Sequence, residues 1–170
     1  MNKKFVFIMT TLFFWSIFRS SFFGEELNAG IEAPSKNPIV FRPHFGYGFV
    51  KGMGKGVFHC GGRILLSSNG LQKYGLEITA FDGKDAKFTS AGIILEQRLF
   101  GWFNMSIGTI GYFGYGDKLD NVAGLTSNLG WEPDNDTSFK PFVTYRNDVI
   151  FNRSTIGVLD SLSVGFAFEF

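Results

Sequence analysis

SLSVGFAFEF, residues 161–170, is the stretch of sequence that decides the fold. Its side chains alternate without a break between apolar residues and small or polar ones. One face holds Leu162, Val164, Phe166, Phe168 and Phe170, and the other holds Ser161, Ser163, Gly165, Ala167 and Glu169. A period of two is that of a β-strand, and about 9–11 residues let a tilted strand cross an outer membrane. The stretch therefore predicts a strand with one face toward lipid and one toward a narrow interior.

The same alternation recurs upstream, between turns rich in Gly, Asp and Asn. The predicted runs cover residues 41–49, 58–67, 73–80, 87–97, 102–115, 122–131, 139–145 and 161–170, with residues 147–160 assigned to strand ends and a long loop. Asp82-Gly83-Lys84-Asp85 is a strong hairpin signal. The even number of runs is typical of bacterial single-chain barrels. We therefore expect an all-β fold, an antiparallel up-and-down transmembrane β-barrel of eight strands.

Composition agrees with a single all-β domain. The 170 residues include 22 Phe and 22 Gly, and 18% are aromatic. Aromatic residues favour strands, and Gly serves turns and close backbone approach. The single cysteine, Cys60, excludes an internal disulfide and sites built on paired cysteines. No basic patch or tail indicates nucleic-acid binding.

The first residues are typical of an export signal. Lys3 and Lys4 precede the mostly apolar run 5–18, which is followed by Arg19. As a helix this run would rise roughly 21 Å, short of the ~30 Å hydrocarbon thickness, so it fits a signal peptide better than a membrane anchor. We assign residues 1–24 to the signal peptide, with cleavage after Ala29 as an alternative. Residues 25–38 are a lead-in, and residues 39–170 are the barrel.

A soluble β-sandwich would also have alternating strands, but two features favour the membrane. Aromatic residues lie at the predicted strand ends, as interfacial girdles do: Phe41, Phe49, Trp102, Tyr115, Trp131, Tyr145 and Phe170. The opposite faces carry Gly, Ser, Thr and scattered charges, whereas a sandwich core needs bulky side chains. Pro43 lacks an N–H, so we expect it at a bulge, near a strand end, or before the first strand.

The end of the chain resembles the C-terminal signal of small bacterial outer-membrane barrels. The resemblance is carried by Leu162, Val164, Phe166, Phe168 and Phe170, and it covers one strand. It implies a place in the outer membrane of a Gram-negative-type cell, reached with the help of the barrel assembly machinery. There the chain would contact outer-membrane lipid and lipopolysaccharide.

The predicted inward face collects most of the charged residues of the strands. The candidate lumen network is Arg42, His44, His59, Arg63, Lys73, Glu77, Arg146 and Glu169. An eight-stranded barrel is just wide enough for its side chains to fill, so these charges should pair and plug it. The alternative is a gate or narrow pore lined by the same residues. His44 and His59 flank one hairpin and could face each other inside, without the further ligands that a metal site needs. Cys60 is predicted to face lipid, and no cofactor is indicated.

Two stretches are loosely similar to the lipid A deacylases, an enzyme family built on eight-stranded barrels. They are residues 141–148 and 161–166. That family uses a lipid-facing His, Ser and acid on late strands, but no histidine follows His59 here. Ser67-Ser68-Asn69-Gly70 is similar to the family's Ser-Asn step but lies in an early hairpin, preceded by Leu66. We therefore expect a non-enzymatic barrel with a structural or surface-interaction role. The alternatives are a narrow pore for small solutes, and a lipid A-modifying acyl hydrolase or an inactive relative of one.

Overall fold

The computed structural model describes residues 39–51, 55–67, 71–84, 86–115, 120–133, 137–152 and 156–170. The signal peptide and the lead-in predicted over residues 1–38 lie outside the described residues. Within the described ranges no helix is long and apolar enough to cross a membrane.

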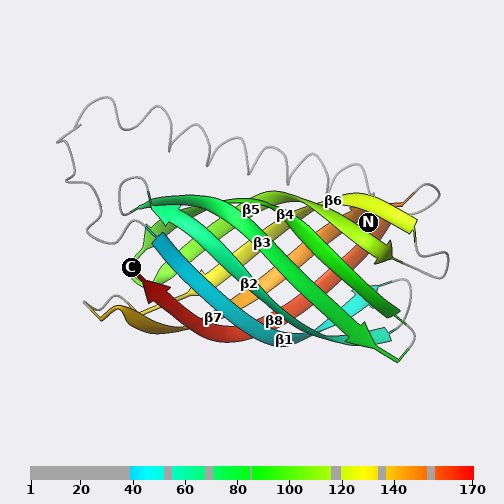
Figure 1. Cartoon of the computed structure of the whole chain (residues 1–170), viewed down its shortest axis with the longest axis horizontal. Helices are drawn as coiled ribbons and strands as arrows, with labels where there is room; N and C mark the ends of the chain where they lie inside the picture. The colour runs from blue at the N-terminus through cyan, green and yellow to red at the C-terminus, as the bar shows by residue number, and fades with distance from the viewer. Residues whose placement is uncertain are drawn as a thin grey trace, which may run out of the picture. The chain divides into compact units, whose positions relative to one another are not determined.

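Eight strands form a closed antiparallel barrel (Figure 1). They are β1 (Ile39–Lys51), β2 (Lys55–Ser67), β3 (Gln72–Gly83), β4 (Ala86–Phe100), β5 (Phe103–Tyr115), β6 (Asp120–Trp131), β7 (Phe139–Phe151) and β8 (Ile156–Glu169). Each strand pairs with its neighbours along the chain, and β1 also pairs with β8. Closure leaves no free strand edge, which is the condition for strands to cross a bilayer. The predicted fold class and strand number are confirmed.

The two ends of the barrel differ in which parts of the chain meet there. At one, the hairpin end, residues 52–54, 84–85, 116–119 and 152–155 connect the strands. At the other, the terminal end, β1 begins and β8 ends, and residues 68–71, 101–102 and 132–138 connect the strands. Every connection is therefore short.

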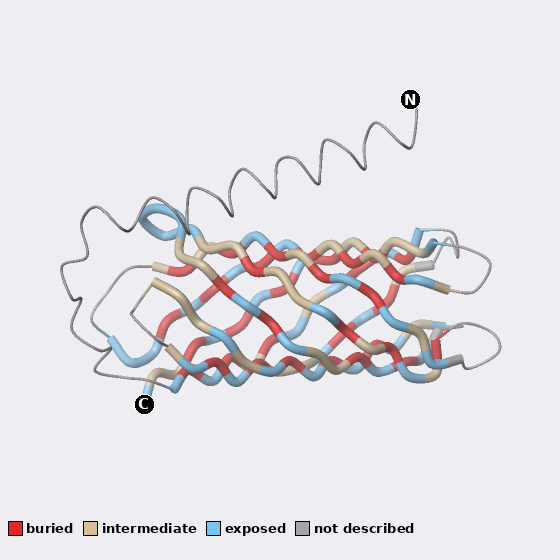
Figure 2. Tube along the Cα trace, turned by 90° about the horizontal axis from the view of Figure 1, so that it is seen from above, coloured by how far each residue is buried: buried red, intermediate tan, exposed pale blue. Residues whose placement is uncertain are grey.

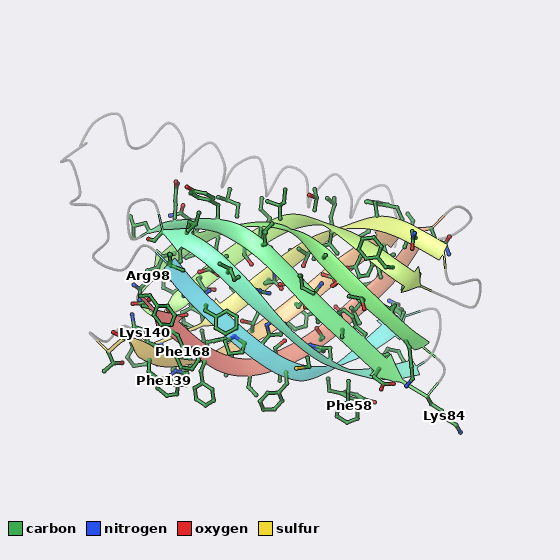
Figure 3. All side chains as sticks on the ribbon, viewed as in Figure 1. Phe58, Lys84, Arg98, Phe139, Lys140 and Phe168 are labelled. Carbon is green, nitrogen blue, oxygen red and sulfur yellow. The ribbon has the colours of Figure 1, made fainter. Side chains whose placement is uncertain are left out.

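The two faces of the strands are sharply different. Buried and exposed residues alternate along the strands (Figure 2). The outward side chains are large and apolar, and Phe58, Phe139 and Phe168 can be seen projecting from the wall (Figure 3). The inward side chains are polar in the middle of the barrel and apolar near the hairpin end. This polarity is the reverse of a soluble protein's and suits a wall in contact with lipid.

The prediction of a long loop within residues 147–160 is wrong. β7 continues to Phe151 and β8 already begins at Ile156, so only residues 152–155 connect them. The polar residues Asn147, Asp148 and Asp160 had the composition of a loop. In the barrel Asp148 is a buried inward residue paired with Arg146, while Asn147 and Asp160 lie opposite each other across the two strands.

The prediction that Tyr115 belongs to an outer aromatic girdle is also wrong. The β5–β6 register shifts between Tyr112 and Tyr115, and Gly114 has a φ of 74°, which glycine adopts without strain. A bulge of this kind reverses the alternation beyond it. Tyr112 and Tyr115 are therefore both buried inside, whereas Phe113 is exposed. Tyr115 does not belong to an outer aromatic girdle.

Pro43 lies within β1, contrary to all three placements expected for it. The strand runs from Ile39 to Lys51 and pairs Pro43 with Gly62 of β2 in regular register. On its other side, the β1–β8 ladder passes from Phe41 to His44 without pairing Arg42 or Pro43. The missing N–H of the proline is thus accommodated by a local gap in the ladder that closes the barrel.

Candidate functional site

The middle of the barrel interior is occupied by a network of ion pairs, here called the central network. It comprises Arg63, Glu77, Asn128, Arg146 and Asp148, which come from β2, β3, β6 and β7. Arg146 is only 1% exposed and lies between two carboxylates: it contacts Glu77 through Nη1 and Asp148 through Nε, the latter at 2.8 Å. Arg63 Nε donates to Glu77 at 2.5 Å. Two buried arginines thus neutralise two buried carboxylates.

Neutral side chains add hydrogen bonds to the central network, although Arg146 Nη2 has no hydrogen-bond partner among the described residues. Arg63 Nη2 donates to Asn128 at 3.1 Å, and the amide of Asn128 donates to Ser106 at 2.9 Å. The Tyr112 hydroxyl donates to Asp148 at 2.5 Å. Because buried charges are stable only when paired and hydrogen-bonded, these contacts hold the network in one arrangement.

A second set of charges, here called the terminal network, lies nearer the terminal end. It comprises Arg42, Lys73, Glu96, Glu132, Lys140 and Glu169. Arg42 reaches Glu96 at 2.5 Å and Glu132 at 2.6 Å. Lys140 pairs with Glu169 at 3.0 Å, and Lys73 lies 3.9 Å from Glu169. Three cations again balance three carboxylates, so the interior carries no excess charge on these residues.

The hairpin end of the interior is filled by a packed apolar cluster, here called the apolar plug. Its residues are Val50, Val57, Phe81, Phe88, Ile110, Tyr112, Tyr115, Ile150 and Leu159, all between 0% and 5% exposed. Phe81 and Phe88 stack with ring centroids 4.5 Å apart, and Phe88 meets Tyr115 edge-on at 5.2 Å. A smaller cluster of Val40, Leu65, Phe142 and Ala167 lies toward the terminal end. The apolar plug thus lies inside the barrel between the central network and the hairpin end.

The eight residues of the candidate lumen network all point inward, but they are divided between the central network and the terminal network. Arg63, Glu77 and Arg146 belong to the central network, with His44 and His59 beside them, while Arg42, Lys73 and Glu169 belong to the terminal network. Glu96, Glu132, Lys140 and Asp148 were not named as network partners from the sequence. Glu96 follows the run Ile93-Ile94-Leu95, which obscures the alternation, and Asp148 lies beyond the predicted end of its strand.

The two histidines lie side by side inside the barrel, with ring centroids 6.0 Å apart. His44 Nε2 lies 3.3 Å from the Thr79 hydroxyl, and His59 packs against Phe81. Neither ring nitrogen of His59 has a hydrogen-bond partner among the described residues. No group of three potential metal ligands occurs in the described part of the chain. Because both histidines are buried inside, neither can act as the lipid-facing base of a deacylase-like site.

The outer wall carries an open groove near the hairpin end, with a volume of about 530 Å³. Tyr47, Gly56 and Phe58 form its apolar part, and Asp82, Gly83, Lys84 and Lys87 form its rim. Lys87 and Asp82 make an exposed ion pair at 3.2 Å, and Lys84 extends from this end of the barrel (Figure 3). Cys60 is exposed on the same wall.

Solved structures show which fold this is. No family model and no curated protein sequence matches the chain. The crystal structure of Neisserial surface protein A (NspA) has a TM-score of 0.63 and 15% identity, covering 82% of this chain and 100% of that one. The N-terminal β-barrel domain of Pseudomonas aeruginosa OprF has a TM-score of 0.52 and 13% identity, covering 78% and 98%. A chain from de novo designed transmembrane β-barrels has a TM-score of 0.51 and 9% identity, covering 81% and 100%. The chain therefore has the fold of the small eight-stranded barrels of bacterial outer membranes.

Proposed function

We propose that the chain is an integral outer-membrane barrel that does not conduct and that has a structural or surface-interaction role. The packed interior is the observation that carries this proposal. Two balanced ion-pair networks and the apolar plug occupy the space that a pore would need. The exposed outward face, with Phe45, Leu76 and Ile78 among its side chains, supports a lipid environment. On this proposal the protein is exported by the signal peptide over residues 1–24 and contacts outer-membrane lipid and lipopolysaccharide.

The filled interior predicts that the barrel carries no steady ion current. Purified protein inserted into a planar lipid bilayer is expected to leave the membrane at its baseline conductance. The apolar plug offers no polar path to hydrated ions, and desolvating an ion costs far more than thermal energy. Folding is confirmed separately by the change in gel migration on boiling in detergent, and insertion by flotation of the protein with lipid vesicles. Stable single-channel steps that scale with the amount of inserted protein would instead favour the narrow pore.

We also propose that the barrel assembly machinery recognises the outward face of β8. That face presents Leu162, Val164 and Phe166, and Phe170 follows it. The Phe170 N–H donates to the Ile39 carbonyl at 2.9 Å, so the end of β8 also closes the seam against β1. This contact uses the backbone, which leaves the exposed Phe170 side chain available for recognition by the assembly machinery.

Phe170→Ala is therefore expected to reduce the amount of folded barrel in cells without weakening the barrel itself. The measurement is the heat-modifiable fraction in outer-membrane preparations, compared with refolding of the purified variant into detergent. Phe100→Ala is the matched control, because Phe100 is 70% exposed and Phe170 is 67% exposed. Equal loss for both variants in cells, or a refolding defect for Phe170→Ala alone, would argue against an assembly role.

A further inference from the structure

Four polar side chains gather on the outer wall where β6, β7 and β8 lie side by side. They are Ser127, Tyr145, Asn147 and Asp160, here called the outer polar cluster. The Tyr145 hydroxyl donates to Asp160 Oδ1 at 2.6 Å, and the Asn147 amide donates to the same oxygen at 2.7 Å. The Ser127 hydroxyl lies 3.4 Å from the Asn147 carbonyl oxygen. Asp160 is thus held by two donors on the outside of the barrel, separate from the networks inside it.

The outer polar cluster interrupts an otherwise apolar stretch of wall. On the hairpin side of Asp160, the outward residues of β7 and β8 are Val149, Phe151, Ile156 and Val158. On the terminal side they are Val143, Leu162, Val164 and Phe166. On β1, Phe49 lies opposite Asp160. The carboxylate is therefore not at a strand end, and an ionisable group on a lipid-facing surface is expensive unless it has a function or a partner.

The hydrogen bonds within the outer polar cluster leave acceptors unused. Both donors go to Oδ1 of Asp160, so Oδ2 receives no hydrogen bond from any described residue. The Asn147 side-chain oxygen accepts none from the described residues either. No lysine, arginine or histidine among the described residues forms an ion pair with Asp160. The site therefore offers oxygen acceptors and a negative charge, and its complement is a cation that carries N–H donors.

We propose that the outer polar cluster binds the primary ammonium group of a membrane amphiphile. This inference rests on the proposed function, because it requires the wall to face lipid. A primary ammonium group has three N–H donors and a positive charge, so it can satisfy Asp160 Oδ2 and Asn147 Oδ1 together. The apolar residues on either side, such as Val158 and Leu162, would contact the acyl chains. A quaternary ammonium group has the same charge but no N–H, and a glycerol headgroup has hydroxyls but no positive charge.

Native mass spectrometry of the full chain in detergent tests the proposal with three lipids that differ in headgroup. Phosphatidylethanolamine supplies the primary ammonium, phosphatidylcholine the quaternary one, and phosphatidylglycerol the hydroxyls. We expect preferential retention of phosphatidylethanolamine, and Asp160→Asn should reduce this preference about tenfold or more, as expected for a lost charge-assisted hydrogen bond. Asp82→Asn is the matched control, since Asp82 is an outward carboxylate already paired with Lys87, and it should keep the preference.

The remaining outcomes are also decisive. Equal retention of phosphatidylethanolamine and phosphatidylcholine, stronger retention of phosphatidylglycerol, or a preference that survives Asp160→Asn would overturn the proposal. Tyr145→Phe keeps the carboxylate and should keep the preference, and a loss of the preference in this folded variant would also overturn the proposal. Heat-modifiable migration and insertion into vesicles are measured on the same samples. Failure to insert would defeat the proposed function, whereas insertion without a headgroup preference would defeat only this inference.

Discussion

Arg146→Met is expected to lower the free energy of unfolding of the barrel by about 3–5 kcal/mol, the usual cost of leaving a buried charge without its partner. Arg146 contacts both Glu77 and Asp148. Without it Glu77 keeps Arg63, but Asp148 keeps only the hydroxyl of Tyr112. Methionine fills much of the space of the arginine stem, so the loss reports mainly on the charge.

The measurement is urea unfolding of the refolded protein in lipid vesicles, followed by tryptophan fluorescence. Lys87→Met is the control, because the Lys87–Asp82 pair has the same charge types but is exposed. Exposed pairs contribute about 0–1 kcal/mol, so this variant should unfold close to the unsubstituted protein. If the two variants lost similar stability, the central network would not be the stabilising element described above.

Phe88→Ala is expected to cost about 3–5 kcal/mol, as for other large-to-small changes in packed interiors. Phe88 is 5% exposed and contacts the rings of Phe81, Tyr112 and Tyr115 inside the apolar plug. Removing its ring leaves a cavity that these neighbours cannot easily fill. The central network still occupies the interior on the terminal side of this cavity, so the variant should remain non-conducting.

The control for this prediction is Phe88→Leu, which keeps most of the volume and should cost less than about 1.5 kcal/mol. Both variants are unfolded in urea under the same conditions and inserted in planar bilayers. An alanine variant as stable as the leucine variant would contradict close packing of the apolar plug. Steady current through the alanine variant would show that the apolar plug alone closes the barrel.

The sequence predicts the strands well wherever one face is apolar and the other small or polar. Over residues 41–49 and 161–170, period-two alternation is unbroken and a one-residue slip would turn every side chain to the wrong face. The pattern fails where this contrast is lost. Asn147 and Asp160 put polar residues on the outer face, and the bulge at Gly114 turns Tyr115 inward.

The inward-facing direction of the charged residues was predictable, but their pairing was not. Alternation assigns a side chain to a face, whereas partners such as Arg42 and Glu96 are 54 residues apart and meet only when the barrel closes. The outer polar cluster was missed for a related reason. Asp160 acquires Tyr145 and Asn147 as donors through the β7–β8 register, within a stretch assigned to a loop.

The short connections between the strands constrain how any partner could recognise this barrel. At the hairpin end only residues 52–54, 84–85, 116–119 and 152–155 join the strands. No single segment there is long enough to present a continuous epitope or to extend toward a receptor. An antibody or receptor binding this end must therefore contact several hairpins at once, so its epitope would be conformational and would be lost when the barrel unfolds.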